Sequence, residues 1–354
     1  MKQPLNSGPI RLGIAGLGRA GWNNFTREME GREGKFRVVA ACDILPERRK
    51  KAAQRFGCAT YERVEDLIAD PNVELVFVAT RSCDHFRHAA AALKAGKHVH
   101  LEKPITVDHA QARRLAELAR RSRGGLFVRH NSRYAPVYQH TRRIMDSGVL
   151  GEVFEIKMLW ASYLRRDDWQ TMLANGGGIM RNTASHMVDQ ALQLMGSPVK
   201  DIWCRLRRVA AVGDAEDHCR LMLVGANGRL VDIELSSGYA VKVEKGVHWT
   251  VLGTRGGLAC DGNTIQLRYL DPRKTLKARK VKPSTTGRFY GTPEELPWIE
   301  KEISVEAHPP GCSKSIWDDL HAAIRLGRPY PITIEQGVEV MRVLTEARRQ
   351  TEFR

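Results

Sequence analysis

The chain has 354 residues, which is too long for one simple core and suits two domains. Its hydrophobic share of 42% and charged share of 27% are ordinary for a globular protein. No apolar run approaches the roughly 20 residues that span a bilayer, and residues 1–9 lack the apolar segment of a secretory signal, so a cytoplasmic protein is expected.

Charge and cysteine content narrow the expected partners. The formal net charge is +16, and the segment from Arg273 to Arg288 holds seven basic residues and no acidic one. A polyanion could bind there, but no nucleic-acid motif or aromatic platform accompanies the segment, which favours a solvated loop. The seven cysteines are scattered singly without a C-x-x-C pair, which argues against a disulfide framework and a zinc site. We predict no metal, no membrane partner and no nucleic-acid partner.

Short apolar runs alternate with helical patterns through the first 130 residues. The predicted strands are Leu12–Gly16, Arg37–Cys42, Leu75–Ala79, His98–Leu101 and Leu126–Arg129. The predicted helices are Ala20–Glu30, Pro46–Phe56, Asp84–Ala95 and Asp108–Ser122. Because this alternation builds a parallel sheet covered on both faces, residues 1–130 are predicted to form a doubly wound α/β domain.

The pattern changes after residue 130. A helix over Ala135–Ser147, a strand over Val153–Trp160, a polar loop to Asn175 and a helix ending near Met195 come first. Strand-like runs follow at about 199–208, 217–224, 229–238, 247–252 and 257–270, then long loops over 271–312, and helices over Ser313–Arg325 and Ile334–Arg349. Consecutive strands without helices between them predict a mostly antiparallel, open-sheet α+β domain over residues 131–354.

The segment Gly16-Leu17-Gly18-Arg19-Ala20-Gly21 has the G-x-G-x-x-G spacing of a Rossmann dinucleotide-binding turn. It follows a predicted strand and opens a helix, as that turn requires. Gly16 permits the tight turn, Gly18 lets the pyrophosphate approach the backbone, and Gly21 lets helix and strand pack closely. The pyrophosphate would lie at the helix N-terminus, where free N–H groups favour an anion.

Asp43 ends the predicted second strand and indicates which dinucleotide binds. A carboxylate at this position accepts hydrogen bonds from the adenosine ribose and repels a 2′-phosphate, which favours NAD over NADP. Arg48 and Arg49 lie close behind, and one of them would bind a 2′-phosphate if the loop folds back, so NADP stays an alternative. A role for Asp43 in capping the helix at Pro46 is compatible with either cofactor.

In four segments the chain resembles the glucose–fructose oxidoreductase, inositol dehydrogenase and rhizopine-catabolism (Gfo/Idh/MocA) family. The segments are the glycine turn with Asp43; Thr80 to His85, similar to T-P-x-x-x-H; Glu102-Lys103-Pro104, the hallmark E-K-P; and Gly176 to Asp189, similar to G-G-G-x-x-x-D-x-G-x-H-x-x-D. Together with Pro331-Ile332-Thr333 and the final helix, the similarity spans essentially the whole chain.

The resemblance implies an oxidoreductase with an N-terminal Rossmann domain and a second domain for substrate binding and oligomerisation. The predicted cofactor residues are Gly16, Gly18, Arg19, Ala20, Gly21, Asp43, Thr80, Ser82, His85, Glu102, Lys103 and Asn131. The predicted substrate residues are Lys103, Arg165, Arg166, Trp169, Asn182 and His186. An open sheet face forms dimers or tetramers in relatives, which implies a homodimer or homotetramer here.

Lys103 is the first predicted catalytic residue. It stands at the carboxyl end of a predicted parallel strand, where open α/β sheets bind their ligands. An ammonium beside an oxidised nicotinamide has a lowered pKa and can polarise a substrate oxygen or exchange its proton. Glu102 would bind the nicotinamide ribose, or alternatively form a salt bridge, and in the family the peptide bond before Pro104 is often cis.

His186 is the second predicted catalytic residue. On a helix, Asn182, His186 and either Asp189 or Gln190 share one face. A histidine with a pKa near neutrality can take the hydroxyl proton as hydride leaves the carbon. The alternative is a buried histidine bound to a backbone carbonyl, but the three glycines ahead of it favour catalysis.

The chain departs from the family pattern at Asn182, which replaces the usual aspartate, and at Ala184 and Arg81, which replace a glycine and a proline. An amide can hold a hydroxyl or orient His186, but it cannot carry a proton. We therefore expect an NAD(P)-dependent dehydrogenase or reductase acting on a secondary alcohol of a sugar, an inositol or a sugar derivative. Two alternatives are a glycoside hydrolase or lyase that oxidises its substrate transiently, and a non-catalytic dinucleotide sensor.

Overall fold

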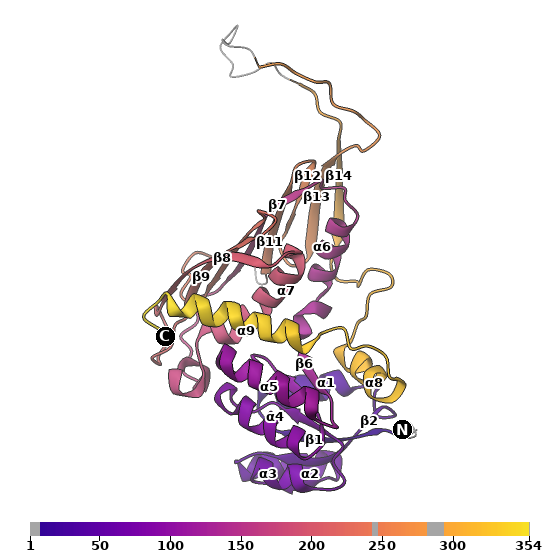
Figure 1. The fold of residues 1–354 in the computed structure, drawn as a ribbon, viewed down its shortest axis with the longest axis vertical. Coiled ribbons are helices and arrows are strands. Elements are labelled where there is room, and N and C mark those ends of the chain that lie inside the picture. Colours follow the sequence, from indigo (N-terminus) through magenta and orange to yellow (C-terminus); the bar gives the residue numbers. More distant parts are fainter. Residues whose placement is uncertain (1–7, 243–246, 282–293, 354) are drawn as a thin grey trace.

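Two β-sheets carry the described part of the chain, with helices packed on and between them (Figure 1). The computed structural model describes residues 8–242, 247–281 and 294–353. Residues 1–7 of the N-terminal segment, and Lys282 and Arg288 of the basic segment, lie outside these ranges. Among the described helices, none is both long and apolar enough to cross a membrane.

The first sheet confirms the predicted doubly wound domain. Its six parallel strands have the order β3-β2-β1-β4-β5-β6, so the direction of winding reverses between β1 and β4. The strands are β1 (Ile10–Ala15), β2 (Phe36–Cys42), β3 (Ala59–Tyr61), β4 (Leu75–Val78), β5 (His98–Glu102) and β6 (Leu126–Arg129). The helices are α1 (Phe25–Met29), α2 (Pro46–Phe56), α3 (Val64–Ala69), α4 (His85–Lys94) and α5 (His109–Arg121).

Three local features of this domain differ from the sequence prediction. The strand β3 and the helix α3 are not predicted because three and six residues are too few to show an apolar period. The predicted helix Ala20–Glu30 is a π-helical turn over Arg19–Asn24 followed by α1. A pattern with a period of 3.6 residues does not reveal this wider turn, which in proteins often marks a functional site.

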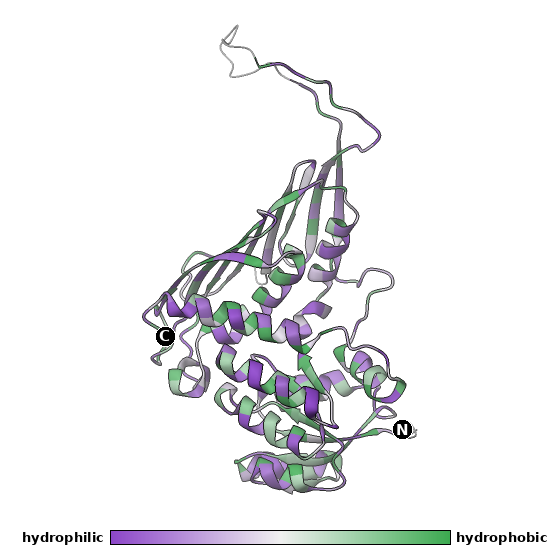
Figure 2. Cartoon of the chain, viewed as in Figure 1, coloured by the Kyte–Doolittle hydropathy of each residue, from purple (hydrophilic) through white to green (hydrophobic). Residues whose placement is uncertain are grey.

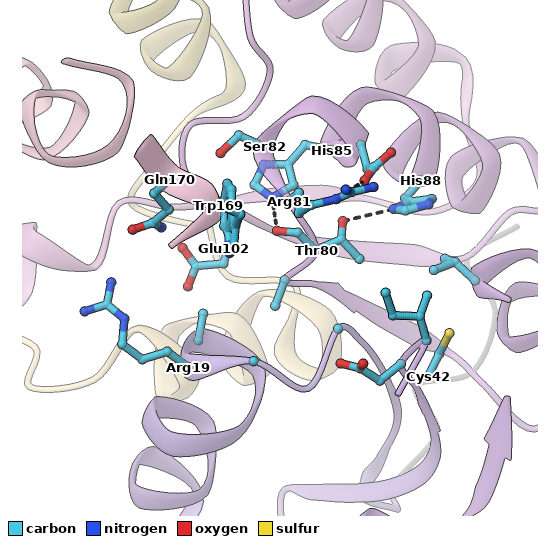
Figure 3. A pocket seen from close by; sticks show the side chains of 18 of the residues that line it. Arg19, Cys42, Thr80, Arg81, Ser82, His85, His88, Glu102, Trp169 and Gln170 are labelled. Carbon is cyan, nitrogen blue, oxygen red and sulfur yellow. Dashed lines mark hydrogen bonds and ion pairs between the residues drawn. The ribbon is translucent and has the colours of Figure 1, made fainter. Parts of the chain in front are cut away.

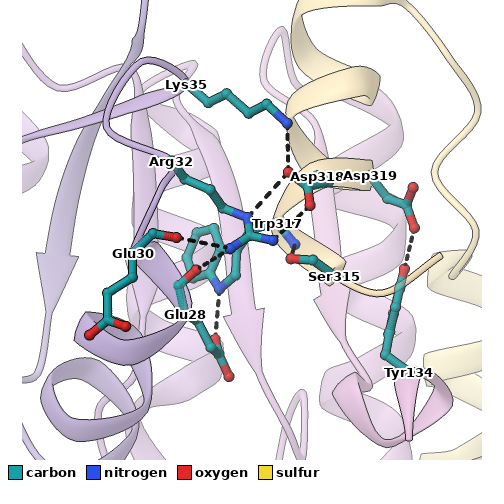
Figure 4. Close-up of polar contacts among 9 residues, drawn as sticks. All are labelled: Glu28, Glu30, Arg32, Lys35, Tyr134, Ser315, Trp317, Asp318 and Asp319. Atoms are coloured by element: carbon teal, nitrogen blue, oxygen red, sulfur yellow. Dashed lines mark hydrogen bonds and ion pairs between the residues drawn. The ribbon is translucent and has the colours of Figure 1, made fainter. Parts of the chain in front are cut away.

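Trp317 packs the late helix α8 (Ile316–Leu326) onto the first sheet. Its side chain is fully buried, and its ring lies 4.6 Å from that of His100 and 5.3 Å from that of Phe77, between centroids. Asp318 on the same helix accepts hydrogen bonds from Arg32 at 2.8 Å and Lys35 at 2.7 Å (Figure 4). A segment more than 180 residues after β6 therefore completes one face of the Rossmann core.

The second sheet confirms the predicted mostly antiparallel domain. Its order is β14-β13-β12-β11-β7-β10-β9-β8, and only the β7–β10 pair is parallel among the described strands. The strands are β7 (Val153–Ala161), β8 (Val199–Arg207), β9 (His218–Gly225), β10 (Leu230–Ser236), β11 (Val247–Gly253), β12 (Gly256–Cys260), β13 (Thr264–Leu270) and β14 (Trp298–Ser304). The helices are α6 (Pro136–Asp146), α7 (Ser185–Met195) and α9 (Ile334–Arg349).

Two sequence predictions for this domain are wrong. The run 257–270 is two strands, because the Asp261 carboxylate accepts from the N–H groups of Asn263 and Thr264 and makes a turn between them. The segment 271–312 is not entirely loop, because Trp298–Ser304 forms the edge strand β14. The charged residues of β14 hide the alternation of apolar and polar residues that predicts a strand. An edge strand with one solvated face carries few apolar side chains.

The last helix, α9, lies between the two sheets. It packs on α5 and β6 of the first domain and on α7 and β8 of the second (Figure 1). Thr333 and Gln336 cap its N-terminus reciprocally, as in a capping box. The outer side of α5 is strongly hydrophilic, whereas Ala112, Leu115 and Ala116 face inward (Figure 2). These helices hold the carboxyl edge of the first sheet against the second domain.

Candidate active site

A cavity of about 770 Å³ runs along the carboxyl edge of the first sheet, across the β1–β4 switch point. In open α/β sheets this crevice is where ligands bind. The turns that follow β1, β2, β4 and β5 line it, together with the loop after β7 and with α7. In Figure 3, Arg19 and Cys42 lie on one side, opposite Thr80, Ser82 and Trp169. Both domains therefore line the same cavity.

The glycine turn has the shape that a bound pyrophosphate needs. Gly16 has a φ of +94°, and a Cβ there would lie 2.6 Å from the carbonyl oxygen of Ala79. A Cβ on Gly21 would lie 1.8 Å from the carbonyl oxygen of Gly16, so no side chain fits beneath the turn. A Cβ on Gly18 would meet only Arg48, at 3.9 Å, which leaves the upper side of the turn open to a ligand.

Asp43 is buried beside this turn and lines the cavity. Its Oδ2 accepts from the N–H of Leu17 at 2.8 Å, and its Oδ1 accepts from the N–H of Leu45 at 3.0 Å. Arg48 forms an ion pair with the same carboxylate at 3.3 Å and remains partly exposed. The carboxylate thus ties β2 to the glycine turn and still lines the cavity.

Another part of the cavity is formed by residues at the end of β5. Glu102 is buried, lines the cavity, and accepts from the N–H of Lys103 at 3.1 Å. The peptide bond between Lys103 and Pro104 is cis. His85 contacts the carbonyl oxygens of Pro104 at 2.7 Å and Thr80 at 3.1 Å, and so joins the ends of β4 and β5.

A chain of hydrogen bonds fixes the Lys103 amine. Its Nζ donates to the carbonyl oxygen of Asn182 at 2.7 Å and to the Oδ1 of Asn182 at 3.2 Å. The Nδ2 of Asn182 donates to the Oε1 of Gln170 at 2.9 Å, and the same oxygen accepts from Arg166. Because Gln170 presents an acceptor, the Asn182 amide must turn its oxygen towards Lys103.

The environment of Lys103 favours its neutral form. Burial lowers the pKa of the amine to about 8, with further lowering by the charges of Arg19, Arg129 and Arg166, while Glu102 acts in the opposite direction. Asn182 supplies two oxygens but no negative charge, so it does not restore the ordinary value. The amine can therefore gain or lose a proton close to physiological pH.

His186 lines the same cavity from α7. Burial and the charges of Lys103, His130 and Arg129 hold its pKa well below the ordinary value, so the ring is a neutral imidazole. Its Nδ1 is buried and has no hydrogen-bond partner among the described residues, which makes Nε2 the nitrogen that a ligand in the cavity reaches. A neutral ring can accept a hydrogen bond or a proton from a hydroxyl group.

The two other residues of the predicted helix face point elsewhere. Asp189 forms a buried, two-pronged pair with Arg133, at 2.7 Å and 2.5 Å, and Gln190 donates to the carbonyl oxygen of Ser132 at 2.7 Å. These contacts fasten α7 to the turn after β6. Asp189 thus positions the helix that carries His186, and it does not line the cavity.

The structure brings most of the predicted site residues together. The cavity is lined by Gly16, Gly18, Arg19, Ala20, Asp43, Thr80, Ser82, His85, Glu102, Lys103, Asn131, Arg166, Trp169 and His186. Gly21 lies beneath the turn and Asn182 behind Lys103, whereas Arg165 is exposed and does not line the cavity. Arg165 and Arg166 are neighbours in the loop after β7, and of the two only Arg166 lines the cavity.

Sequence reasoning missed Gln170 and Arg129, which also line the cavity. Gln170 directly follows Trp169 and precedes the three glycines, and only this position beside predicted site residues could have indicated that it lines the cavity. Arg129 closes an otherwise apolar strand, and a charged residue in that position is a signal that strand prediction alone does not use.

Comparison with known proteins identifies related sequences for both domains. The model of an oxidoreductase family with an NAD-binding Rossmann fold, GFO_IDH_MocA, matches residues 10–130. The model of the GFO/IDH/MocA C-terminal domain matches residues 138–259. Together the two matches cover the cavity walls on both sides, apart from the segment between them.

Individual relatives are distant but cover nearly the whole chain. An uncharacterised oxidoreductase of Escherichia coli, YdgJ, is 27% identical over 95% of this chain and 94% of its own length. The scyllo-inositol 2-dehydrogenase (NADP(+)) IolW of Bacillus subtilis is 24% identical over 96% of this chain and 92% of its own. The WlbA dehydrogenase of Bordetella pertussis, solved with NADH and UDP-GlcNAcA, has a TM-score of 0.76 at 19% identity, covering 98% and 97% of the two chains.

The glycine turn gives a direct test of dinucleotide binding. We expect Gly21→Ala to weaken NAD binding at least about 10-fold, because the new Cβ would displace the turn that cradles the pyrophosphate. Gly34→Ala is the matched control, since a Cβ there meets nothing within 4 Å. Isothermal titration calorimetry with NAD measures both variants, and equal affinities would remove the turn from the binding site.

Proposed function

The chain belongs to the Gfo/Idh/MocA oxidoreductase family, and from this premise we propose that it transfers a hydride between NAD and a secondary alcohol of a sugar, an inositol or a sugar derivative. The observation that carries the proposal is the placement of the Lys103 amine and the neutral His186 in one cavity with the glycine turn. Residues 1–130 would bind the cofactor, and residues 131–354 the substrate and further copies of the chain in a homodimer or homotetramer.

The side chains at this end of the cavity suit a polyhydroxylated ring. Trp169 offers a flat apolar face to the C–H groups of a sugar, and Arg166 and Gln170 offer polar groups to its hydroxyls. Relatives with named substrates act on or bind such compounds: IolW is a scyllo-inositol dehydrogenase, and WlbA was solved with UDP-GlcNAcA. These observations support a sugar, an inositol or a sugar derivative as the substrate, and an assay with individual compounds would identify which one reacts.

The dinucleotide is proposed to be NAD. Asp43 has a buried carboxylate that would accept hydrogen bonds from the adenosine ribose, and a 2′-phosphate there would meet a like charge. Arg48 lies against that carboxylate and is partly exposed, so it is the residue that would accommodate NADP. The relatives include both cases, since IolW is named for NADP(+) and WlbA was solved with NADH.

The residues present can hold this cofactor and manage the proton. Bound NAD would accept the hydride that leaves the alcohol carbon, while the hydroxyl proton passes to the protein and the alcohol becomes a ketone. Lys103 has three N–H bonds when charged, of which Asn182 takes two, so the third can bind the substrate oxygen. The neutral amine accepts the proton during oxidation, and the ammonium donates it during reduction.

His186 and Glu102 complete the arrangement. With its hydrogen on Nε2, the neutral ring of His186 would donate a hydrogen bond to the oxygen of the reacting hydroxyl, which leaves the hydroxyl hydrogen free to point towards Lys103. Glu102 would accept from the ribose of the nicotinamide half with the lone pairs that its protein partners leave free. No acidic side chain is required for the proton transfer, which is consistent with an amide at residue 182.

A substrate panel tests the proposed function. We expect the protein with NAD to produce NADH from at least one member of a panel of sugars, inositols and sugar acids, measured at 340 nm, and to use NADP less efficiently. Aryl glycosides belong in the same panel. Release of aglycone without NADH would indicate cleavage through transient oxidation, and NAD binding without either product would contradict the proposal.

Removal of the Lys103 amine tests its role. We expect Lys103→Ala to lower kcat/KM by about 10²–10⁴-fold, the usual contribution of a general acid or base, while NAD affinity changes less than about twofold. Lys94→Ala, at an exposed position of α4, is the matched control and should behave as the wild type. Retention of turnover in Lys103→Ala would take Lys103 out of the mechanism.

The pH dependence tests which group exchanges the proton. Because the pKa of Lys103 is lowered to about 8, kcat/KM for alcohol oxidation should rise with pH and level off above that value, and kcat/KM for ketone reduction should fall there. Asn182→Asp should move both profiles to higher pH, since a carboxylate at hydrogen-bond distance stabilises the ammonium. Profiles that do not move in Asn182→Asp would assign the titration to another group.

A further inference from the structure

Arg129 is a buried cation beside the reactive end of the cavity. It ends β6, its side chain is 1% exposed, and its guanidinium lies 5.8 Å from the centre of the Phe77 ring. A buried arginine is costly unless its charge is compensated, so its partners indicate what it does. Its Nε has no hydrogen-bond partner among the described residues.

Two carboxylates share this guanidinium. Nη1 forms an ion pair with the Oε1 of Glu102 at 3.1 Å, and Nη2 donates to the Oε2 of Glu28. The same oxygen of Glu28 accepts from the indole N–H of Trp317 at 2.7 Å (Figure 4). Arg129 therefore links the helix behind the phosphate turn to the end of β5.

Glu102 and Lys103 are neighbours in the chain, yet their side chains do not pair. Among the described residues, no ion pair within 4.0 Å joins the Lys103 amine to the Glu102 carboxylate. Glu102 instead binds Arg129 and the backbone N–H of Lys103, and the amine binds Asn182. A carboxylate held by a guanidinium is drawn away from an adjacent ammonium.

We propose that Arg129 is a positioning residue that holds the Glu102 carboxylate away from the Lys103 amine, so that the amine remains free to exchange a proton with the substrate. The inference rests on the proposed function for the proton transfer itself, but the state of the amine is a property of the protein without cofactor. Arg129 need not touch the substrate to act in this way.

The charges around Lys103 determine the sign of the effect. The groups that act on it come from every element around it: Glu102, Arg129, Arg19, Arg166, His85, His130 and His186. Glu102 is the carboxylate of this set, and the three histidines have lowered pKa values, so they are neutral. Loss of Arg129 removes a positive charge and releases Glu102 towards Lys103, and both changes raise the pKa of the amine.

The test measures the amine directly in the protein without cofactor. Competitive acetylation with acetic anhydride over a pH series, read by peptide mass spectrometry, gives the midpoint at which Lys103 loses its proton. In Arg129→Met we expect the midpoint to rise by about one pH unit, and the pH profile of alcohol oxidation to move by the same amount. An unchanged or lower midpoint in folded protein would falsify the proposal.

Glu28→Gln is the matched variant on the far side of Arg129. It keeps an oxygen to accept from Trp317 but removes the charge that Glu28 shares with the guanidinium, so the Lys103 midpoint should fall. A merely structural network would lower stability in both variants without moving the midpoint in opposite directions. If Arg129→Met does not fold, as judged by circular dichroism, Glu28→Gln alone decides, and a constant or raised midpoint overturns the proposal.

The two proposals can fail separately. Opposite shifts of the Lys103 midpoint in protein that turns over no member of the panel would support Arg129 as the positioning residue and contradict the proposed reaction. If the protein turns over a substrate but the Lys103 midpoint is the same in Arg129→Met and Glu28→Gln as in the wild type, the reaction is supported and the role of Arg129 is contradicted.

Discussion

The hydrogen bonds from the Lys103 amine to Asn182 join the two domains at the point where the reaction is proposed to occur. Lys103 stands at the end of β5 in the first sheet, and Asn182 in the π-helical turn, Met180–Ala184, that precedes α7 in the second domain. Contact between them buries the amine, which is the largest cause of its lowered pKa. The contact between the domains and the lowered pKa of the lysine are therefore linked through the same interface.

An amide in place of an acid changes how such a site handles a proton. With a carboxylate at residue 182, the ammonium would be stabilised and a second proton-carrying group would stand beside it. With Asn182, the lysine is oriented by neutral oxygens, and Gln170 fixes which atom of the amide it meets. In the proposed reaction the proton exchange then rests on Lys103, and burial holds the pKa of His186 well below its ordinary value, so that its ring is neutral.

The sequence was informative where local patterns determine structure. Five of the six parallel strands, the glycine turn and the Glu102-Lys103-Pro104 segment are predicted, because burial and backbone shape restrict those residues locally. Gln170 and Arg129 were not, because their roles depend on partners 12 and 27 or more residues away. Strand β14 was missed for a related reason, since its pairing with β13 and not its composition makes it a strand.

The helix α8 has a consequence for how this protein can be divided. Trp317 is fully buried among Phe25, Phe36, Phe77 and His100, and burying about 200 Å² of a tryptophan side chain contributes roughly 5 kcal/mol before entropy costs, at about 25 cal/mol per Å². A fragment ending at residue 130 would contain every strand of the first sheet and still present an uncovered aromatic face to water. The nucleotide-binding unit is therefore built from two separate parts of the sequence, the residues up to 130 and the helix α8. A transfer of the first part alone to another protein would leave behind the helix that covers its sheet.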